Sequence, residues 1–223
     1  MKIDYDALVN DADPDNRIIA AENGCGWDIL VHDPIPEVRN TARYMSFVKS
    51  NDRDERIQAA MLGYGLDELI HDENEHVRAA VASQGFRLNE LVSDESWHVR
   101  RAVANQGYEL ETLVHDKNEH VRLAVAQQGY GLHILVYDAN VFVREAVAEK
   151  GYGLDILIRD KDWYVRRAVA EQGYGLEKLV YDKDSSVRKA VAKQGYGLDI
   201  LSRDEHWVVS EAAKKELLRL ANQ

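Results

Sequence analysis

Residues 63–84 read GYGLDELIHDENEHVRAAVASQ, and the next 22 residues, 85–106, read GFRLNELVSDESWHVRRAVANQ. The same phrase restarts every 22 residues toward the C-terminus. Its seven copies begin at Gly63, Gly85, Gly107, Gly129, Gly151, Gly173 and Gly195. A fixed period of this length is typical of a solenoid, in which each repeat buries its apolar face only against its neighbours. The sequence therefore predicts one elongated domain with a long surface and no deep central pocket.

Each copy carries the start and stop signals of one helix. With the first glycine as position 0, position 11 is Asn74 in the first copy and Asn, Ser or Asp in every other copy except the last, which has His206. Such side chains accept a hydrogen bond from an unpaired N–H at a helix start. Val77, Ala80 and Val81 then form one apolar face at i, i+3 and i+4. The next glycine can close the helix in the left-handed conformation.

The other half of the repeat predicts a shorter element. Leucines at positions 3 and 6, such as Leu66 and Leu69, suit one or two turns of α- or 3₁₀-helix. The glycines at positions 0 and 2 are interpreted as turn and cap residues, because the Gly-Tyr-Gly motif lacks the third glycine and the preceding strand of a nucleotide-binding loop.

The repeat register also divides the chain. Residues 1–62 contain all three prolines and a shortened unit from Ser46 to Leu62, so we interpret them as an N-terminal cap with degenerate repeats. Residues 63–194 are six regular repeats, and 195–223 are a C-terminal capping repeat that continues as a longer helix from Glu211 to Ala221. We expect about nine units in one continuous domain.

Composition restricts the classes of partner and compartment. The chain has 28 basic and 39 acidic residues, a formal net charge of −11, which disfavours wrapping a polyphosphate. The single cysteine, Cys25, excludes an intramolecular disulfide and favours a reducing compartment. The start Met1-Lys2-Ile3 leads into no apolar signal segment, and no stretch approaches the roughly 18 apolar residues of a membrane span. We expect a cytoplasmic protein without a membrane partner, and we predict no oligomeric state.

The repeat resembles two related families. Leu-x-x-Leu followed by Asp-x-x-x-x-Val-Arg-x-Ala-Val-Ala, over roughly residues 11–213, is similar to the leucine-rich-repeat variant and to HEAT-like repeats. This resemblance implies an all-α, right-handed α-solenoid in which α-helices alternate with short 3₁₀-helices. It also implies that the Asp of position 9 and the Arg of position 15, such as Asp72 and Arg78, bridge within and between units. The unit here is shorter than is usual in either family. Some leucine-rich variants also carry a cysteine cluster for an iron–sulfur centre, which Cys25 alone cannot form.

Several conspicuous residue types are interpreted as structural or as surface residues. The aromatic residue at position 1 of every copy, as in Tyr64, suits packing at the seam between units. Histidines recur at position 13, as in His76 and His98, but neighbouring helices lie about 8–10 Å apart, so three such imidazoles cannot reach one metal ion. No Gly-x-Ser-x-Gly, Walker or Cys–His signature is present. We therefore expect neither an enzyme nor a bound metal or cofactor.

The copies differ most informatively at positions 12, 13 and 16. Positions 12 and 16 are neighbours on one helical face, which places Trp97 over Arg101 and Trp163 over Arg167. Aromatic residues and arginine are enriched at binding hot spots. The alternative is that these side chains pack against the adjacent repeat. The candidate binding residues are Trp97, His98, Arg101, Phe142, Trp163, Tyr164, Arg167 and Trp207.

Three functions remain open from the sequence. The first, which we favour, is a non-catalytic scaffold that binds a protein or peptide along one face of the solenoid. The second is nucleic-acid binding, because HEAT-like alkylpurine DNA glycosylases use a comparable array of Trp, Arg and acidic residues; the net charge of −11 weighs against it. The third is an acidic rod that mimics nucleic acid toward a basic partner.

Overall fold

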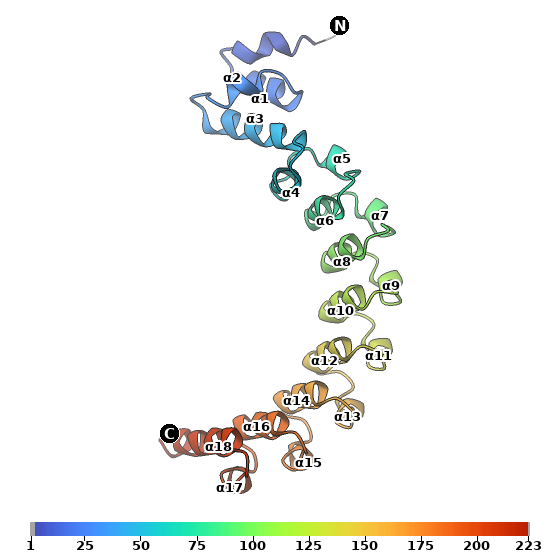
Figure 1. The fold of residues 1–223 in the computed structure, drawn as a ribbon, viewed down its shortest axis with the longest axis vertical. Coiled ribbons are helices and arrows are strands. Elements are labelled where there is room, and N and C mark those ends of the chain that lie inside the picture. The colour runs from blue at the N-terminus through green and yellow to red at the C-terminus, as the bar shows by residue number, and fades with distance from the viewer. Residues whose placement is uncertain (1–2, 223) are drawn as a thin grey trace. The chain divides into compact units, whose positions relative to one another are not determined.

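The computed structural model describes residues 3–222, which form an all-α array of repeated helix pairs (Figure 1). The long helices are α1 (Pro14–Glu22), α3 (Pro36–Val48), α4 (Arg53–Met61), α6 (Glu75–Ser83), α8 (Trp97–Asn105), α10 (Glu119–Gln127), α12 (Val141–Glu149), α14 (Trp163–Glu171), α16 (Ser185–Lys193) and α18 (Trp207–Ala221). The short helices are α2 (Trp27–Leu30), α5 (Leu66–Leu69), α7 (Leu88–Leu91), α9 (Leu110–Leu113), α11 (Leu132–Leu135), α13 (Leu154–Leu157), α15 (Leu176–Leu179) and α17 (Leu198–Leu201). A 3₁₀ turn, η1 (Asp6–Asn10), precedes them.

Residues 1, 2 and 223 lie outside the described residues, so the predicted N-terminal cap is described from residue 3 and the predicted C-terminal capping repeat to residue 222. Within the described range, no helix is both long and apolar enough to cross a membrane.

The long helices begin and end where the repeat predicts. The side chain of Asn74 accepts a hydrogen bond from the N–H of His76 at 3.0 Å, and the predicted caps of the next five copies do the same. His206 forms no side-chain cap on α18. The helices then stop before a glycine with positive φ, as at Gly85 (φ +74°). Caps and glycines in the sequence therefore set the nine-residue helices directly.

The short helices are single α-turns, whereas the family resemblance implied 3₁₀-helices. In α13, the N–H of Leu157 donates to the carbonyl of Gly153 at 2.9 Å, and that of Ile158 to Leu154 at 3.0 Å; both are i→i−4 bonds. A bond of the 3₁₀ type precedes them, from Ile156 to Gly153 at 3.0 Å. The carbonyl of Gly153 therefore accepts both the first 3₁₀ bond and the first α bond of this short helix.

The glycine at position 2 is needed for conformation and for space. Gly153 has φ +61°, and a Cβ atom there would lie 2.7 Å from Cγ2 of Val136, at the end of the preceding short helix. Two repeats have other residues at this position, and Arg87 (φ 42°) and Glu109 (φ 49°) adopt the same left-handed conformation. Such a conformation costs an L-residue roughly 1–2 kcal/mol.

The chain divides into two compact units, Met1–Tyr108 and Glu109–Gln223. In the first unit, α1 packs on α3, α3 on α4, α4 on α6 and α6 on α8. In the second, α10, α12, α14, α16 and α18 pack in succession, with the short helices α9, α11, α13, α15 and α17 in a second row (Figure 1). Successive long helices within each unit therefore contact one another, as a repeat array requires.

The core of each unit lies between successive long helices. Val143, Val147 and Ala148 of α12 have no exposed surface, and Leu135 of α11 is 1% exposed. The corresponding residues are buried in the other regular repeats. Burial of each such valine or leucine contributes roughly 1.5–3 kcal/mol. The apolar face predicted from positions 14, 17 and 18 is confirmed.

Arginine–aspartate pairs join successive repeats, as the resemblance implied. In the second unit, Nε of Arg144 donates to Oδ2 of Asp160 in the next repeat at 2.7 Å, while its Nη1 donates to the carbonyl of Asp138 in its own repeat at 2.8 Å. Both paired side chains are 8% exposed. Burial alone would raise the pKa of Asp160, but hydrogen bonds from Arg144 and from the Asp162 N–H outweigh it and lower the pKa.

We call this set of pairs the Arg–Asp ladder. Its members are Arg17–Asp33, Arg56–Asp72 and Arg78–Asp94 in the first unit, and Arg122–Asp138, Arg144–Asp160, Arg166–Asp182 and Arg188–Asp204 in the second. Glutamines at the helix ends add a second link between repeats; for example, Nε2 of Gln194 donates to the carbonyl of Glu171 at 3.0 Å.

The irregular regions match their sequence. The shortened unit between Ser46 and Leu62 contains α4 but no short helix, so α3 leads directly into α4. The predicted longer C-terminal helix is α18, which has 15 residues.

Candidate binding surface

The variable positions 12, 13 and 16 are the first, second and fifth residues of the regular long helices. The cap at position 11 makes position 12 the first helical residue, as at Trp163 in α14. Side chains there lie outside the buried valine and alanine face, and they differ between repeats that otherwise share the same helix bounds. Because the described chain divides into two compact units, we describe the candidate residues of each unit separately.

In the second unit, α12 and α14 bring four candidate residues together, which we call the Trp163 cluster. The rings of Trp163 and Tyr164 stack with centroids 3.8 Å apart. Arg167 lies over both rings, 5.5 Å and 5.6 Å from their centroids. Phe142 of α12 lies 6.0 Å from Tyr164 and is 51% exposed. The predicted pairing of Trp163 with Arg167 is confirmed. The cluster thus holds the half-exposed ring of Phe142 near the more buried guanidinium of Arg167.

Arg167 is held by carboxylates as well as by rings. Its Nη2 donates to Oε1 of Glu145 at 2.8 Å, and its Nε lies 3.6 Å from Oε1 of Glu171 and has no hydrogen-bond partner among the described residues. Burial raises the pKa of Glu145, even though the Arg167 charge acts in the opposite direction. The Arg167 side chain is 32% exposed, so this guanidinium also takes part in packing between repeats.

In the first unit, α8 carries an equivalent arrangement, the Trp97 cluster. Trp97 and His98 stack with ring centroids 3.8 Å apart, and Arg101 lies 5.3 Å from the Trp97 centroid, as predicted. The ring of His76 on α6 meets His98 edge to face at 4.7 Å. Trp97 and His98 are half-buried and Arg101 is exposed. Arg101 is therefore more accessible to a partner than Arg167.

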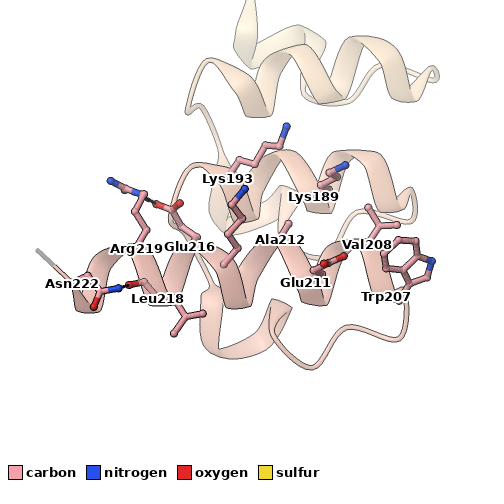
Figure 2. Close-up of a pocket in the computed structure, with 11 residues that line it drawn as sticks. Lys189, Lys193, Trp207, Val208, Glu211, Ala212, Glu216, Leu218, Arg219 and Asn222 are labelled. Carbon is pink, nitrogen blue, oxygen red and sulfur yellow. Dashed lines mark hydrogen bonds and ion pairs between the residues drawn. The ribbon is translucent and has the colours of Figure 1, made fainter.

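Trp207, on the first turn of α18, differs from the other two tryptophans. It is 69% exposed, and position 16 of its helix is Glu211 in place of arginine. Trp207 lies at one end of a groove of about 670 Å³ between α16 and α18 (Figure 2). Four basic side chains line this groove, Lys189, Lys193, Lys215 and Arg219. Lys189 occupies the variable position 16, whereas the sequence reasoning missed the other three. The basic residues at position 20 of the last two copies would have revealed Lys193 and Lys215.

The structure thus brings the candidates together in part. Trp97, His98 and Arg101 form one cluster, and Phe142, Trp163, Tyr164 and Arg167 form another. Trp207 belongs to the α16–α18 groove. A single continuous binding face from Trp97 to Trp207 stays a prediction.

The other singled-out residues have local roles. In the second unit, the tyrosines at position 1 of each repeat are partly exposed and are not buried between repeats; Tyr152, for example, is 42% exposed. Cys25 is half-buried, and burial is the main cause of its raised pKa. Within residues 3–222, no group of three or more His, Cys, Asp or Glu side chains could hold a metal ion.

Comparison with known proteins adds a structural likeness. No protein-family model and no curated protein sequence matches the chain. The structure is similar to an X-ray structure of the Escherichia coli protein YibA, with 98% of each chain covered, 16% sequence identity and a TM-score of 0.46.

Proposed function

We propose that this protein is a non-catalytic interaction scaffold that binds a protein or peptide through the exposed side of its long helices. One observation carries the proposal. Helix α16 has Ser185, Ser186 and Lys189 at positions 12, 13 and 16, yet it has the same length and cap as α14 and donates the same ladder pair. The aromatic and arginine residues of α14 are therefore not required by the repeat frame.

The chemistry of the two clusters suits protein recognition. Trp, Tyr and Arg supply large contact areas and are the residue types that dominate binding hot spots. In both clusters the tryptophan is already stacked and covered by a guanidinium, so a partner would meet an ordered surface. Pre-ordered side chains lower the entropy cost of association. With a net charge of −11, the chain suits a protein partner better than a nucleic acid.

The repeat array supplies its own matched variants for a test. Trp163→Ser, Tyr164→Ser and Arg167→Lys together give α14 the residues that α16 carries at the same positions. Trp97→Ser, His98→Ser and Arg101→Lys do the same for α8. Both triple variants are expected to keep the circular dichroism spectrum of the parent. Loss of a hot-spot tryptophan costs about 2 kcal/mol or more, so partner affinity should fall about thirtyfold.

The measurement is affinity capture from the native lysate, followed by titration of the retained protein against parent and variants. The proposal expects at least one triple variant to lose the retained protein. Equal retention by the parent and by both folded variants would contradict it. A labelled single- or double-stranded DNA that binds with an affinity falling steeply with salt would favour the nucleic-acid alternative instead.

A further inference from the structure

The groove between α16 and α18 includes exposed apolar side chains in its lining. On α18, Trp207, Val208, Ala212 and Leu218 line it, and Trp207 and Leu218 are 69% and 65% exposed. Figure 2 shows Trp207 near one end of the groove and Asn222 near the other. The lining follows α18 over its 15 residues, roughly 22 Å at 1.5 Å per residue. This length matches a helical segment of about four turns.

The groove is basic, although the protein as a whole is acidic. Four basic side chains line it, against two acidic ones, in a chain of net charge −11. Arg219 pairs with Glu216 within the groove. Within residues 3–222, Lys189, Lys193 and Lys215 form no ion pair, so their ammonium groups are available to a ligand. Unpaired cations beside exposed apolar side chains complement a ligand that carries both carboxylates and apolar side chains.

We infer that the α16–α18 groove binds an acidic amphipathic helix of a partner protein. Apolar side chains of that helix pack on Trp207 and Leu218, and its carboxylates pair with Lys189, Lys193 and Lys215. This inference rests on the proposed scaffold function and specifies the chemistry of the partner. A helix laid along a groove uses anchors at i, i+3, i+4 and i+7, and Trp207 and Leu218 lie on nearly the same side of α18, where such anchors can reach them.

A nucleic acid fits the same groove less well. The exposed Leu218 side chain offers no contact to a phosphate, whereas it can pack on an apolar side chain of a helix. Binding of single strands also relies on successive aromatic platforms, whereas Trp207 is the one aromatic ring that lines this groove among the described residues.

The test uses a fluorescein-labelled 15-residue peptide of Glu, Ala and Leu, with leucine at every third or fourth position, titrated into the full chain by fluorescence anisotropy. Two peptide controls have the same composition with scrambled leucines, or lysine in place of glutamate. The proposal expects saturable binding of the first peptide alone. The variant Lys189→Glu/Lys193→Glu should weaken that binding about tenfold or more, as should Trp207→Ser.

A matched charge control separates the groove from the overall field. Lys178→Glu/Lys183→Glu changes the net charge equally at two exposed lysines that do not line the groove, and it should leave the affinity within about twofold. Equal weakening by both double variants would overturn the proposal. So would absence of binding to the parent chain, or binding to the scrambled peptide with the same affinity.

Three further measurements test other occupants of the groove and separate failure of the groove inference from failure of the scaffold function. Tighter binding of oligo-dT than of the acidic peptide would overturn the inference in favour of nucleic acid, and a concentration-dependent dimer that Trp207→Ser abolishes would identify a second copy as the occupant. If the triple variant of α14 loses a captured partner while the groove variants retain it, the scaffold function stands and the groove inference fails. Circular dichroism of each variant checks that it folds.

Discussion

Removal of Arg166 from the Arg–Asp ladder should destabilise the second unit strongly. Nε and Nη2 of Arg166 donate to the two carboxylate oxygens of Asp182 at 2.6 Å and 2.8 Å, and Nη1 donates to the carbonyl of Asp160 at 2.8 Å. Both side chains of the pair are only 7% exposed. In Arg166→Met the apolar stem remains, but Asp182 becomes a buried carboxylate without its cation.

The expected loss follows from this burial. Breaking a buried ion pair by removing one partner costs about 3–5 kcal/mol, chiefly because the remaining charge is uncompensated. Adding Asp182→Asn to Arg166→Met removes that charge, and the amide oxygen can still accept the N–H of Asp184, which now bonds to Oδ1 at 2.9 Å. The double variant should therefore be more stable than Arg166→Met alone.

The assay is urea unfolding at pH 7 followed by far-ultraviolet circular dichroism, with Arg203→Met as the control. Arg203 is exposed and forms no ion pair among the described residues, so its loss should change stability by no more than about 0.5 kcal/mol. Hydrogen exchange should locate the effect at α14 and α16, because each repeat contacts only its neighbours. A loss below about 1 kcal/mol for Arg166→Met, or a double variant less stable than the single one, would refute the reasoning.

Three other predictions concern pH, glycine geometry and the thiol. A hydrogen bond from arginine is the main cause of the lowered pKa of Asp204, and the same holds for Asp33. The stabilisation from these two carboxylates is therefore complete above the unfolded pKa of about 3.9 and should be lost as pH falls below it; an acid titration of ellipticity that stays flat to pH 2 would contradict this. Gly153→Ala should destabilise more than Gly151→Ala in urea unfolding, by about 1–3 kcal/mol, because both have positive φ but the new Cβ would lie 2.7 Å from Val136 at the first site and 3.9 Å from its nearest neighbour at the second. Cys25 should react with iodoacetamide at pH 7 more slowly than free cysteine, since burial raises its pKa; an equal or faster rate would oppose this.

Much of the fold could be predicted because its determinants are local. The cap at Asn74, the glycine at Gly85 and the apolar spacing between them lie within a few residues of the bonds they specify, so the bounds of α6 follow from the sequence. The same cap and glycine positions recur in the other regular repeats, so the bounds of their long helices follow in the same way. The short helices were less determined, since a four-residue turn differs between α and 3₁₀ only in which carbonyl accepts each N–H.

The candidate surface was predictable only where it lies on one helix. The pairs Trp97 with Arg101 and Trp163 with Arg167 follow from the i,i+4 spacing. Contacts between helices did not follow in the same way: Glu145 of α12 binds Arg167 of α14, which makes this arginine partly a packing residue. Sequence reasoning about a single helix face could not find that pair.

The sequence by itself determined the period, the helix bounds and the residues that vary between repeats, because these depend on interactions along one segment of chain. The tertiary structure decided which variable side chains remain accessible, because exposure depends on the neighbouring helix. It left Trp207 largely exposed, partly covered Trp163, and placed Lys189 and Lys193 of α16 along α18 to form a basic groove in an acidic protein.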